Sequence, residues 1–284
     1  MKLSVITICL NELEIERTCK SIFEQTFNDF EWIIIDGQSN IQTINKIKKY
    51  ISKIDLFISE KDSGIYDAMN KGILYAKGEY VSFMNAGDTF YSKTILSEIF
   101  EKNFYMDDVI YGNVNIIKNN KSHIENNPNY ITKDFFLNGT INHQSCFIKR
   151  NLFQKYGLYD ITYKYASDYE KFILFSKANV KFRYVNQIIA NHYRNGISSD
   201  KNSVSIEWKK IQNKYFSKSE RKNCGIKYKV ILFGLNLLSI KEIFPKKYVK
   251  LFGIFTIFKL KKNLIYLFGL NFLPILKLKG NVNE

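Results

Sequence analysis

Acidic side chains end three of the apolar segments in the first part of this chain. The segments lead into Asp36, into Asp62 and into Asp88. Short apolar segments are typical of buried strands, and ligands of open α/β sheets bind at the carboxyl ends of the strands. Carboxylates gathered at such an edge can hold a cation and accept hydrogen bonds from a base. The pattern therefore points to an enzyme that handles a sugar nucleotide.

The segments between these acids alternate in type, because apolar runs are followed by stretches of helical periodicity. The expected strands cover residues 3–10, 32–35, 54–59 and 79–84, and the expected helices cover residues 12–25, 41–52 and 65–77. This alternation predicts an α/β fold with a doubly wound, mostly parallel sheet. The last helix is expected to end at Gly78. No G-x-G-x-x-G segment follows the first strand, so a dinucleotide phosphate loop is missing.

The rest of the chain has a mixed pattern. We expect helices over 92–103, 133–138 and 166–178, strands over 108–118, 144–148, 180–185 and 187–193, and a loop over 118–128. This order predicts a first domain over residues 1–208, in which a mixed lobe (92–208) follows a nucleotide-binding half (1–91).

Composition narrows the setting of the protein. Hydrophobic residues make up 45% of the 284 residues, which excludes a disordered chain and a membrane bundle. The four cysteines form no C-x-x-C pair, which favours buried thiols in a reducing compartment such as the cytoplasm. Residues 1–10 resemble a signal peptide only superficially, because acidic residues follow them and no small-residue cleavage site is present. We interpret them as the first strand.

The positive charge of the chain is concentrated in a C-terminal extension. Of the net charge of +15, residues 209–284 contribute +14, from 17 Lys or Arg and 3 Glu. A Leu-Phe-Gly triplet recurs at 232–234, 251–253 and 267–269, and the longest uncharged run, 263–276, is shorter than the roughly 20 residues that span a bilayer. The extension could contact an anionic membrane surface, pack against the body or bind nucleic acid. We expect a basic, amphipathic membrane contact and no nucleic acid.

Five segments resemble a known family. In the order and spacing of that family, they are Ser4–Glu12, Ile35–Ser39, Ser59–Gly72, Met84–Asp88 and Ala166–Glu170. They are similar to the inverting family 2 glycosyltransferases with the GT-A fold, particularly the bacterial enzymes of capsule, O-antigen (lipopolysaccharide) and exopolysaccharide assembly. The chain lacks the Gln-x-x-Arg-Trp motif of the processive polymerases, so the resemblance implies the addition of single sugars.

The resemblance implies that the first half binds the nucleotide of a sugar donor. Thr7, Asn11 and Glu12 would lie along the nucleotide. Asp36 would accept the N–H of the base, which suits uracil and hence a UDP-sugar. Alternatively, Asp36 could serve only to cap the turn after its strand. Asp62 would also face the nucleotide.

The helix after Asp62 would approach the donor with Asn70 and Lys71, although Lys71 equally suits an ordinary exposed lysine. Its apolar stripe is expected to belong to the core, and this stripe consists of Ile65, Met69 and Ile73.

Asn85, Ala86 and Asp88 correspond to the acidic metal motif of the family and would contact the donor. A divalent cation, Mn²⁺ or Mg²⁺, would be held at Asp88 and would bridge the two phosphates. Gly87 stands where the motif usually has its second acid, so the phosphates of the donor would supply much of the coordination.

Asp168 matches the catalytic base of the family, which removes the proton of the acceptor hydroxyl. The alternative is a helix N-cap, since an apolar-periodic run follows Asp168. The resemblance places His143, Gln144 and Glu170 on the acceptor side, although a His before a strand equally suits a structural role. His192 belongs to a segment that would pass over the donor, and no zinc site is expected there.

These residues predict a non-processive glycosyltransferase at the inner face of the cell membrane. It would move one sugar from a nucleotide-sugar to a lipid-linked oligosaccharide or surface-polysaccharide precursor. A catalytically silent nucleotide-sugar or glycan-binding scaffold is the alternative, favoured by the reduced metal motif. A nucleic-acid-binding protein would rest on charge alone, and the sequence contains no recognised module for it.

Overall fold

Strand β1 (Leu3–Cys9) is buried along its whole length within a group of parallel strands. In the computed structural model, β2 (Phe30–Asp36) and β4 (Tyr80–Phe83) pair with β1 on either side, and β3 (Leu56–Ser59) pairs with β2. Parallel strands are covered by helices on both faces, which explains the continuous apolar runs in the sequence. The predicted doubly wound, parallel sheet is confirmed for this half of the chain.

Helices connect these strands in the expected order. They are α1 (Ile15–Phe23), α2 (Ile41–Lys48) and α3 (Ile65–Tyr75), with the short 3-10 turn η1 (Ile51–Lys53) after α2. The strand register sets Cys9 beside Asp36 and Asp36 beside Ser59. The carboxyl ends of β1, β2 and β3 are therefore level, and the side chains after them gather on one rim.

The sheet continues with strands of mixed direction. Its nine strands follow the order β3-β2-β1-β4-β8-β6-β9-β5, and β7 pairs with β6. The added strands are β5 (Thr89–Phe90), β6 (Val109–Lys118), β7 (Lys121–Glu125), β8 (Cys146–Lys149) and β9 (Phe182–Tyr193). β8 is antiparallel to both β4 and β6, whereas β6 and β9 are parallel. The mixed lobe of the predicted fold class is confirmed.

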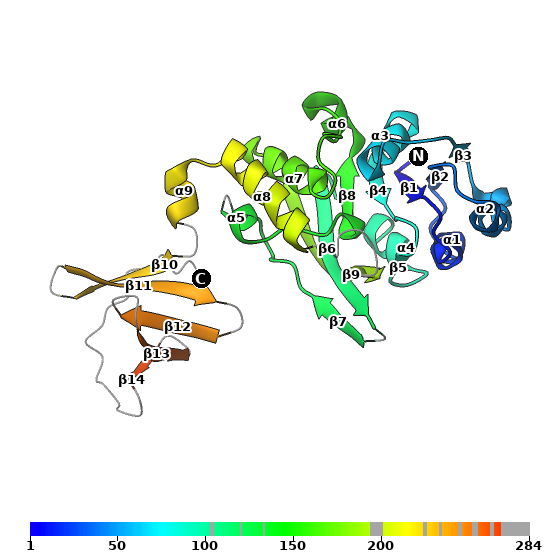
Figure 1. Ribbon diagram of the computed structural model, residues 1–284. Helices are drawn as coiled ribbons and strands as arrows, with labels where there is room; N and C mark the ends of the chain where they lie inside the picture. Colours follow the sequence, from blue (N-terminus) through cyan, green and yellow to red (C-terminus); the bar gives the residue numbers. More distant parts are fainter. Residues whose placement is uncertain are drawn as a thin grey trace. The chain divides into compact units, whose positions relative to one another are not determined.

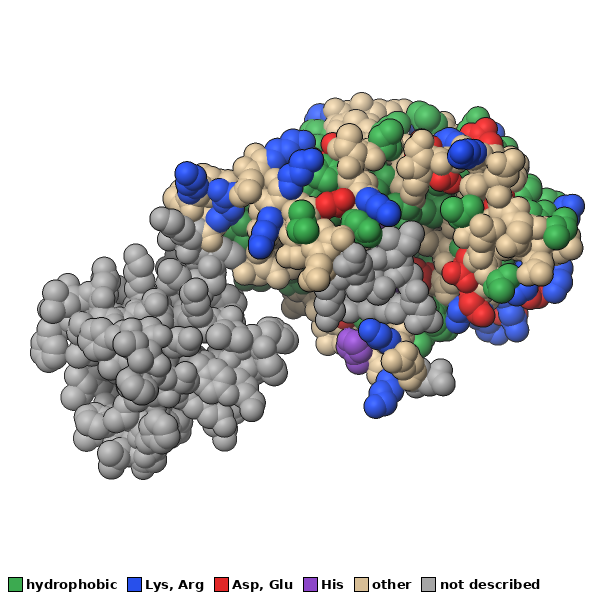
Figure 2. Space-filling model, in the orientation of Figure 1, with side chains coloured by type: hydrophobic (Ala, Val, Ile, Leu, Met, Phe, Trp, Pro, Cys, Tyr) green, Lys and Arg blue, Asp and Glu red, His purple; other side chains and the backbone are tan. Residues whose placement is uncertain are grey.

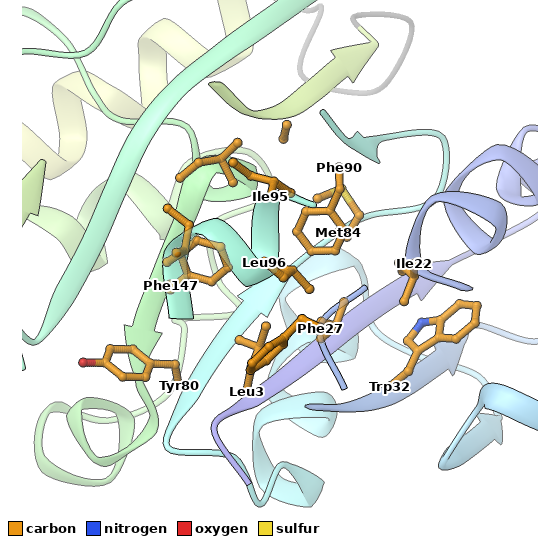
Figure 3. Close-up of a cluster of buried hydrophobic side chains, with 14 of the residues drawn as sticks. Leu3, Ile22, Phe27, Trp32, Tyr80, Met84, Phe90, Ile95, Leu96 and Phe147 are labelled. Carbon is orange, nitrogen blue, oxygen red and sulfur yellow. The ribbon is translucent and has the colours of Figure 1, made fainter. Parts of the chain in front are cut away.

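Helices α7 and α8 pack together on this mixed part of the sheet, with α5 beside α7 (Figure 1). The helical elements are α4 (Ile95–Phe100), α5 (Phe135–Asn138), η2 (His143–Ser145), α6 (Arg150–Tyr156), α7 (Ser167–Lys177) and α8 (Lys201–Tyr215). One hydrophobic core spans both halves, because Leu3, Trp32 and Tyr80 of the parallel strands share it with Phe147 of β8 (Figure 3).

Three local expectations about this sheet and its helices were wrong. The expected loop over 118–128 contains β7, an edge strand whose mostly exposed side chains gave no apolar alternation. The two strands expected between 180 and 193 form the single strand β9. Helix α3 ends at Tyr75 and not at Gly78. Gly78 is instead a close-packing site, because a Cβ atom there would lie 2.5 Å from the backbone nitrogen of Ser4.

The chain divides into two units, residues 1–215 and 216–284. The structure describes residues 1–102, 105–119, 121–132, 134–193 and 201–223, and beyond them five strands. The predicted boundary after residue 208 falls inside α8, whose last turns belong to the first unit. Among the described residues, no helix is both long and apolar enough to cross a membrane.

The second unit contains α9 (Lys218–Asn223) and an antiparallel sheet of five strands in sequence order. The strands are β10 (Ile226–Leu232), β11 (Leu235–Ile243), β12 (Lys246–Leu251), β13 (Phe255–Lys261) and β14 (Leu264–Leu267). The leucines of the three Leu-Phe-Gly triplets end β10, β12 and β14. The Phe-Gly residues of the triplets lie outside the described residues.

Candidate active site

Asp36 ends β2 with a buried carboxylate that is only half engaged. Its Oδ2 accepts hydrogen bonds from the Ser39 N–H at 2.9 Å and from the Ser59 hydroxyl at 2.6 Å. Its Oδ1 is buried and has no partner within the part of the chain that the structure describes. One oxygen therefore holds the turn, as the capping interpretation expects, and the other can accept a hydrogen bond from a ligand. Leaving such a buried acceptor unsatisfied would cost about 1–3 kcal/mol, so a ligand N–H fits this position.

Asn11 and Glu12 follow β1 on the same rim. Asn11 has a left-handed backbone (φ +53°), and its Oδ1 accepts the Asn40 N–H at 2.8 Å. The side chain of Glu12 lies near Gly87. Thr7 is buried within β1, where its Oγ accepts the Trp32 indole N–H at 3.0 Å. The described geometry thus places Asn11 and Glu12 at the rim and gives Thr7 a contact inside the sheet.

Asp62 lies against the turn that follows Asp36. Its Oδ1 accepts the Gly64 N–H at 2.9 Å. Its Oδ2 occupies the place that a Cβ atom at residue 37 would need, so Gly37 makes room for this carboxylate. The ends of β2 and β3 therefore bring Asp36 and Asp62 to neighbouring positions on the rim.

The two α3 residues expected near the donor have protein partners in the structure. Asn70 is buried, and its amide both donates to the Tyr159 carbonyl and accepts the Tyr159 N–H, each at 2.9 Å. Lys71 reaches the Glu60 carboxylate at 2.8 Å and the Lys61 carbonyl at 3.0 Å. Both residues hold loops in place here. Of the apolar stripe, Met69 and Ile73 are buried as expected for core residues.

Asp88 is held by three groups that come from distant parts of the chain. Its Oδ1 accepts the Tyr193 N–H at 2.9 Å, and its Oδ2 accepts a hydrogen bond from the Gln144 amide at 2.9 Å. The His192 Nδ1 lies 3.1 and 3.2 Å from the two carboxylate oxygens. Gly87 (φ +96°) forms the turn that directs this carboxylate toward β9. A carboxylate is thus paired with an imidazole across 104 residues of sequence.

The donor set at Asp88 fits a divalent cation whose coordination is completed by the ligand. Carboxylate oxygens suit Mn²⁺ and Mg²⁺ sites that share their ion with phosphates, whereas an imidazole ligand is typical of transition metals and not of Mg²⁺. Nearby, the Asn85 Oδ1 is buried without a partner among the described residues. Within the described ranges, no group of three or more His, Cys, Asp or Glu residues could hold a metal ion by itself. Asp88 and His192 are therefore the residues that could hold a shared cation.

Asp168 is the second residue of α7, and the helix N-cap is Ala166. Its Oδ1 accepts the Tyr66 hydroxyl at 2.9 Å and the Tyr169 N–H at 2.9 Å. Its Oδ2 lies 2.9 Å from the His143 Nδ1 and accepts no second hydrogen bond from the described part of the chain. The N-cap interpretation is therefore wrong, and Oδ2 is the oxygen that retains an acceptor position.

Burial by itself would raise the pKa of Asp168, but hydrogen bonds from His143, Tyr66 and the Tyr169 N–H outweigh it, and the pKa is lowered. Burial also raises the pKa of the Tyr66 hydroxyl, which therefore stays protonated and donates. Asp168 is consequently a carboxylate at neutral pH and can accept a proton.

The turn η2 connects the two carboxylates. His143 contacts Asp168 through Nδ1, and its Nε2 lies 3.1 Å from the Asn85 Nδ2. The next residue, Gln144, donates to Asp88. His143 and Gln144, which the resemblance places on the acceptor side, thus lie between the expected base and the expected metal carboxylate. Two adjacent side chains fix the separation of the two groups.

Glu170 and Ala86 lie close in sequence to these carboxylates but have different surroundings. Glu170 is 4% exposed, and its carboxylate is bound by Lys214 at 2.7 Å and by the Tyr215 hydroxyl at 3.1 Å. Ala86 donates its N–H to the Ile8 carbonyl at 3.0 Å, which ties the Asn85–Asp88 turn to β1. In the described geometry the Glu170 carboxylate binds side chains of α8. Its acceptor-binding role therefore stays a prediction.

Sequence reasoning missed Tyr66 and Tyr193, and it named His192 without its partner Asp88. The signal for His192 was its place in a segment expected to pass over the donor, and this place did not indicate a contact with Asp88. Tyr66 and Asp168 are 102 residues apart, so no local spacing indicates their contact.

A family model described as glycosyl transferase family 2 matches residues 4–181 of the chain. A PGL/p-HBAD biosynthesis glycosyltransferase of Mycobacterium bovis is 28% identical over 196 residues, covering 66% of this chain and 75% of the relative. An uncharacterized glycosyltransferase of Mycobacterium tuberculosis is 31% identical over 186 residues, covering 60% and 67%.

Solved structures agree with the fold. The crystal structure of residues 1–349 of S. aureus TarS has a TM-score of 0.59 at 19% identity and covers 79% of this chain and 69% of that chain. The same protein in complex with UDP-GlcNAc has a TM-score of 0.57, covering 79% and 70%. The mannosyltransferase PcManGT from Pyrobaculum calidifontis, in complex with GDP-Man and Mn²⁺, has a TM-score of 0.52 at 17% identity, covering 67% and 56%.

Proposed function

The chain belongs to glycosyl transferase family 2, and from this premise we propose that it moves one sugar from a UDP-sugar to an acceptor hydroxyl with inversion, without processive addition. The observation that carries the proposal is the arrangement of Asp168. Its carboxylate is partly buried, ionised and oriented by three donors, while its Oδ2 accepts only the contact with His143 within the described part of the chain. This is the geometry that a general base needs.

The proposed reaction is a single displacement. The acceptor hydroxyl donates to the Asp168 Oδ2 and loses its proton to this oxygen as its own oxygen bonds to the anomeric carbon. The bond from that carbon to the phosphate oxygen breaks, and the nucleoside diphosphate leaves with the electron pair. Attack from the face opposite the leaving group inverts the configuration, so a second carboxylate nucleophile is unnecessary.

The Asp88 carboxylate would hold a Mn²⁺ or Mg²⁺ ion, and the His192 imidazole would add a ligand only to a transition metal such as Mn²⁺. When bound, the ion supplies positive charge to the departing diphosphate. The Mn²⁺ of the PcManGT complex belongs to that protein, and for this chain the cation is inferred from the carboxylate–imidazole pair.

The donor is proposed to be a UDP-sugar because of the free oxygen of Asp36. A buried oxygen that can only accept selects a base with an N–H at that point, such as the imide of uracil. The structure of TarS with UDP-GlcNAc supports the same class by likeness. Asn11, Glu12 and Asp62 would line the nucleotide beside Asp36.

The acceptor is proposed to be a lipid-linked oligosaccharide or surface-polysaccharide precursor, reached at the cytoplasmic face of the membrane. The basic extension is the support, since a Lys or Arg near an anionic leaflet contributes about 1 kcal/mol. Removing residues 224–284 leaves α8 and α9 in the chain. This deletion should reduce sedimentation with phosphatidylglycerol vesicles, and undiminished sedimentation would contradict the membrane role.

Calorimetric titration with UDP, GDP, CDP and dTDP, each with and without Mn²⁺, tests the donor site. We expect UDP to bind most tightly, and Mn²⁺ to strengthen its binding in the wild type but not in Asp88→Ala. Tighter binding of another nucleotide would overturn the UDP assignment. Absence of binding by folded protein would favour a scaffold without transferase activity.

A further inference from the structure

Helix α8 contacts the segment that carries Asp168 both before and after this residue. It lies beyond residues 4–181, which match the family model. We propose that α8 is a positioning element for the Asp168 carboxylate, with Glu207 and Trp208 as the positioning residues. The inference rests on the proposed function only in naming Asp168 as the base.

Glu207 fixes the backbone that enters α7. Its Oε1 accepts the Lys164 N–H and its Oε2 accepts the Tyr165 N–H, both at 2.8 Å. The N-cap of α7, Ala166, makes no side-chain cap hydrogen bond. Hydrogen bonds from N–H groups to a carboxylate are about twice as strong as neutral ones, so Glu207 restrains this turn where a capping side chain is missing.

Trp208 fixes the residue that follows Asp168. Its indole stacks on the Tyr169 ring with the centroids 4.2 Å apart and the planes 12° apart. The Tyr169 hydroxyl donates to the Phe136 carbonyl and accepts a hydrogen bond from Gln212 at 2.9 Å. Tyr169 is also the residue whose N–H binds the Asp168 Oδ1. The stack therefore holds one of the three donors that orient the base.

The contacts of α8 fall on one face of the helix, as residues on successive turns do. Glu207 and Trp208 are followed by Gln212 and then by Lys214, which binds Glu170. Lys209 is exposed, and Lys side chains lie over α8 on the face shown in Figure 2. One side of α8 thus contacts residues on both sides of Asp168, and the other side faces solvent.

The contacts of α8 matter for function because the orientation of Asp168 depends on two things. One is the set of side chains that bind its carboxylate, and the other is the position of its backbone in the first turn of α7. His143 and Tyr66 bind the carboxylate directly, and they come from η2 and α3 rather than from the helices that contact α8. The Tyr169 N–H depends on the placement of the first turn of α7. Loss of the Trp208 stack should therefore misdirect the Asp168 carboxylate. It should leave intact the donor rim, which consists of Asn11, Glu12, Asp36 and Asp62.

The experiment compares Trp208→Ala with Trp208→Phe, which keeps an aromatic ring to stack. Phe30→Ala serves as the matched control, because it removes a ring stacked on Phe27 (13° between planes) at the amino end of β2, away from the site. The pKa of Asp168 is followed by ¹³C NMR of its carboxyl carbon in the full chain. Release of UDP from UDP-sugars, with water as acceptor, gives kcat and KM.

We expect Trp208→Ala to move the Asp168 titration to higher pH and to lower kcat about 10-fold with little change in KM, because misplacement of a catalytic group costs rate. Trp208→Phe should restore most of both values. Phe30→Ala should lower the unfolding temperature and leave the Asp168 titration where it was. An unchanged titration in folded Trp208→Ala would overturn the positioning role.

Asp168→Asn separates this inference from the proposed function. If Asp168→Asn keeps the full rate of UDP release, the proposed function fails whatever α8 does. If Asp168→Asn loses activity while Trp208→Ala keeps both its titration and its kcat, only the role of α8 is wrong.

Discussion

Asp36 has a buried carboxylate and Asp168 a partly buried one, and the two regions that hold them are built differently. The partners of Asp36 are Ser39, which follows β2, and Ser59, which ends the neighbouring parallel strand β3. The partners of Asp168 include Tyr66 from α3 and His143 from η2, which are remote in sequence. Sheet topology alone assembles the donor rim, whereas the base depends on side chains from several elements. A substitution that disables the catalytic base Asp168 should therefore leave the donor rim unchanged.

Replacement of the base gives the largest expected effect. Asp168→Asn should lower kcat by about 10²–10⁴-fold, because the amide cannot take the proton of the acceptor. Binding of UDP, measured by calorimetry, should be unchanged. A comparable loss of UDP binding would show that the two regions are not independent.

A substitution on the donor rim should have the opposite signature. Asp36→Asn can keep one oxygen toward Ser39 and Ser59 but places N–H donors where the free Oδ1 was. UDP binding should weaken about 10- to 100-fold, since two donors would then face each other, and CDP should lose less. Asp55→Asn is the control, because its carboxylate binds the Trp32 N–H away from this oxygen. Equal losses of affinity for UDP and CDP would contradict the proposed hydrogen bond between Asp36 and the N–H of the nucleobase.

The pH dependence tests how Asp168 is kept ionised. Its pKa is lowered in the folded protein, so the active carboxylate is present above that pKa and is lost as the pH falls through it. His143→Leu removes the hydrogen bond that does most to lower this pKa and leaves burial in force. The acidic limb of the kcat profile should move to higher pH. A limb that stays in place would mean that another group sets it.

A matched pair of buried glutamates gives the smallest expected effect. The Glu31 Oε1 accepts hydrogen bonds from the Ser4 hydroxyl and the Lys77 N–H, both at 2.6 Å, in the donor half. Glu31→Gln should lower the free energy of unfolding by about 1–3 kcal/mol and leave kcat unchanged. Glu170→Gln should destabilise to a similar extent and also lower kcat, because Glu170 joins α7 to α8. Denaturant unfolding and rate measurements on both variants decide this.

The first half of the fold could be predicted from sequence because its signal is local. Each buried parallel strand is a continuous apolar run, and the acid at its end lies on the common rim. β7 could not be predicted, because an edge strand with exposed side chains carries no burial pattern. Helix α6 also went unpredicted, as its seven residues are too few for a clear periodicity.

The sequence predicted which residues belong to the candidate site but not which of them contact one another. Asp88, Asp168 and His143 were found through the resemblance, but the pairing of Asp88 with His192 spans 104 residues. Such contacts are created when β9 returns along β6 and when η2 lies beside β4. Neither arrangement corresponds to a characteristic spacing of residues in the sequence.

The close approach of Asp62 to Gly37 has a consequence for how this rim can evolve. The Oδ2 of Asp62 fills the space that any side chain at position 37 would need. Position 37 can therefore gain a side chain only after position 62 has lost its carboxylate or moved it. In related sequences a side chain at position 37 should therefore occur together with a different residue, or a reoriented carboxylate, at position 62.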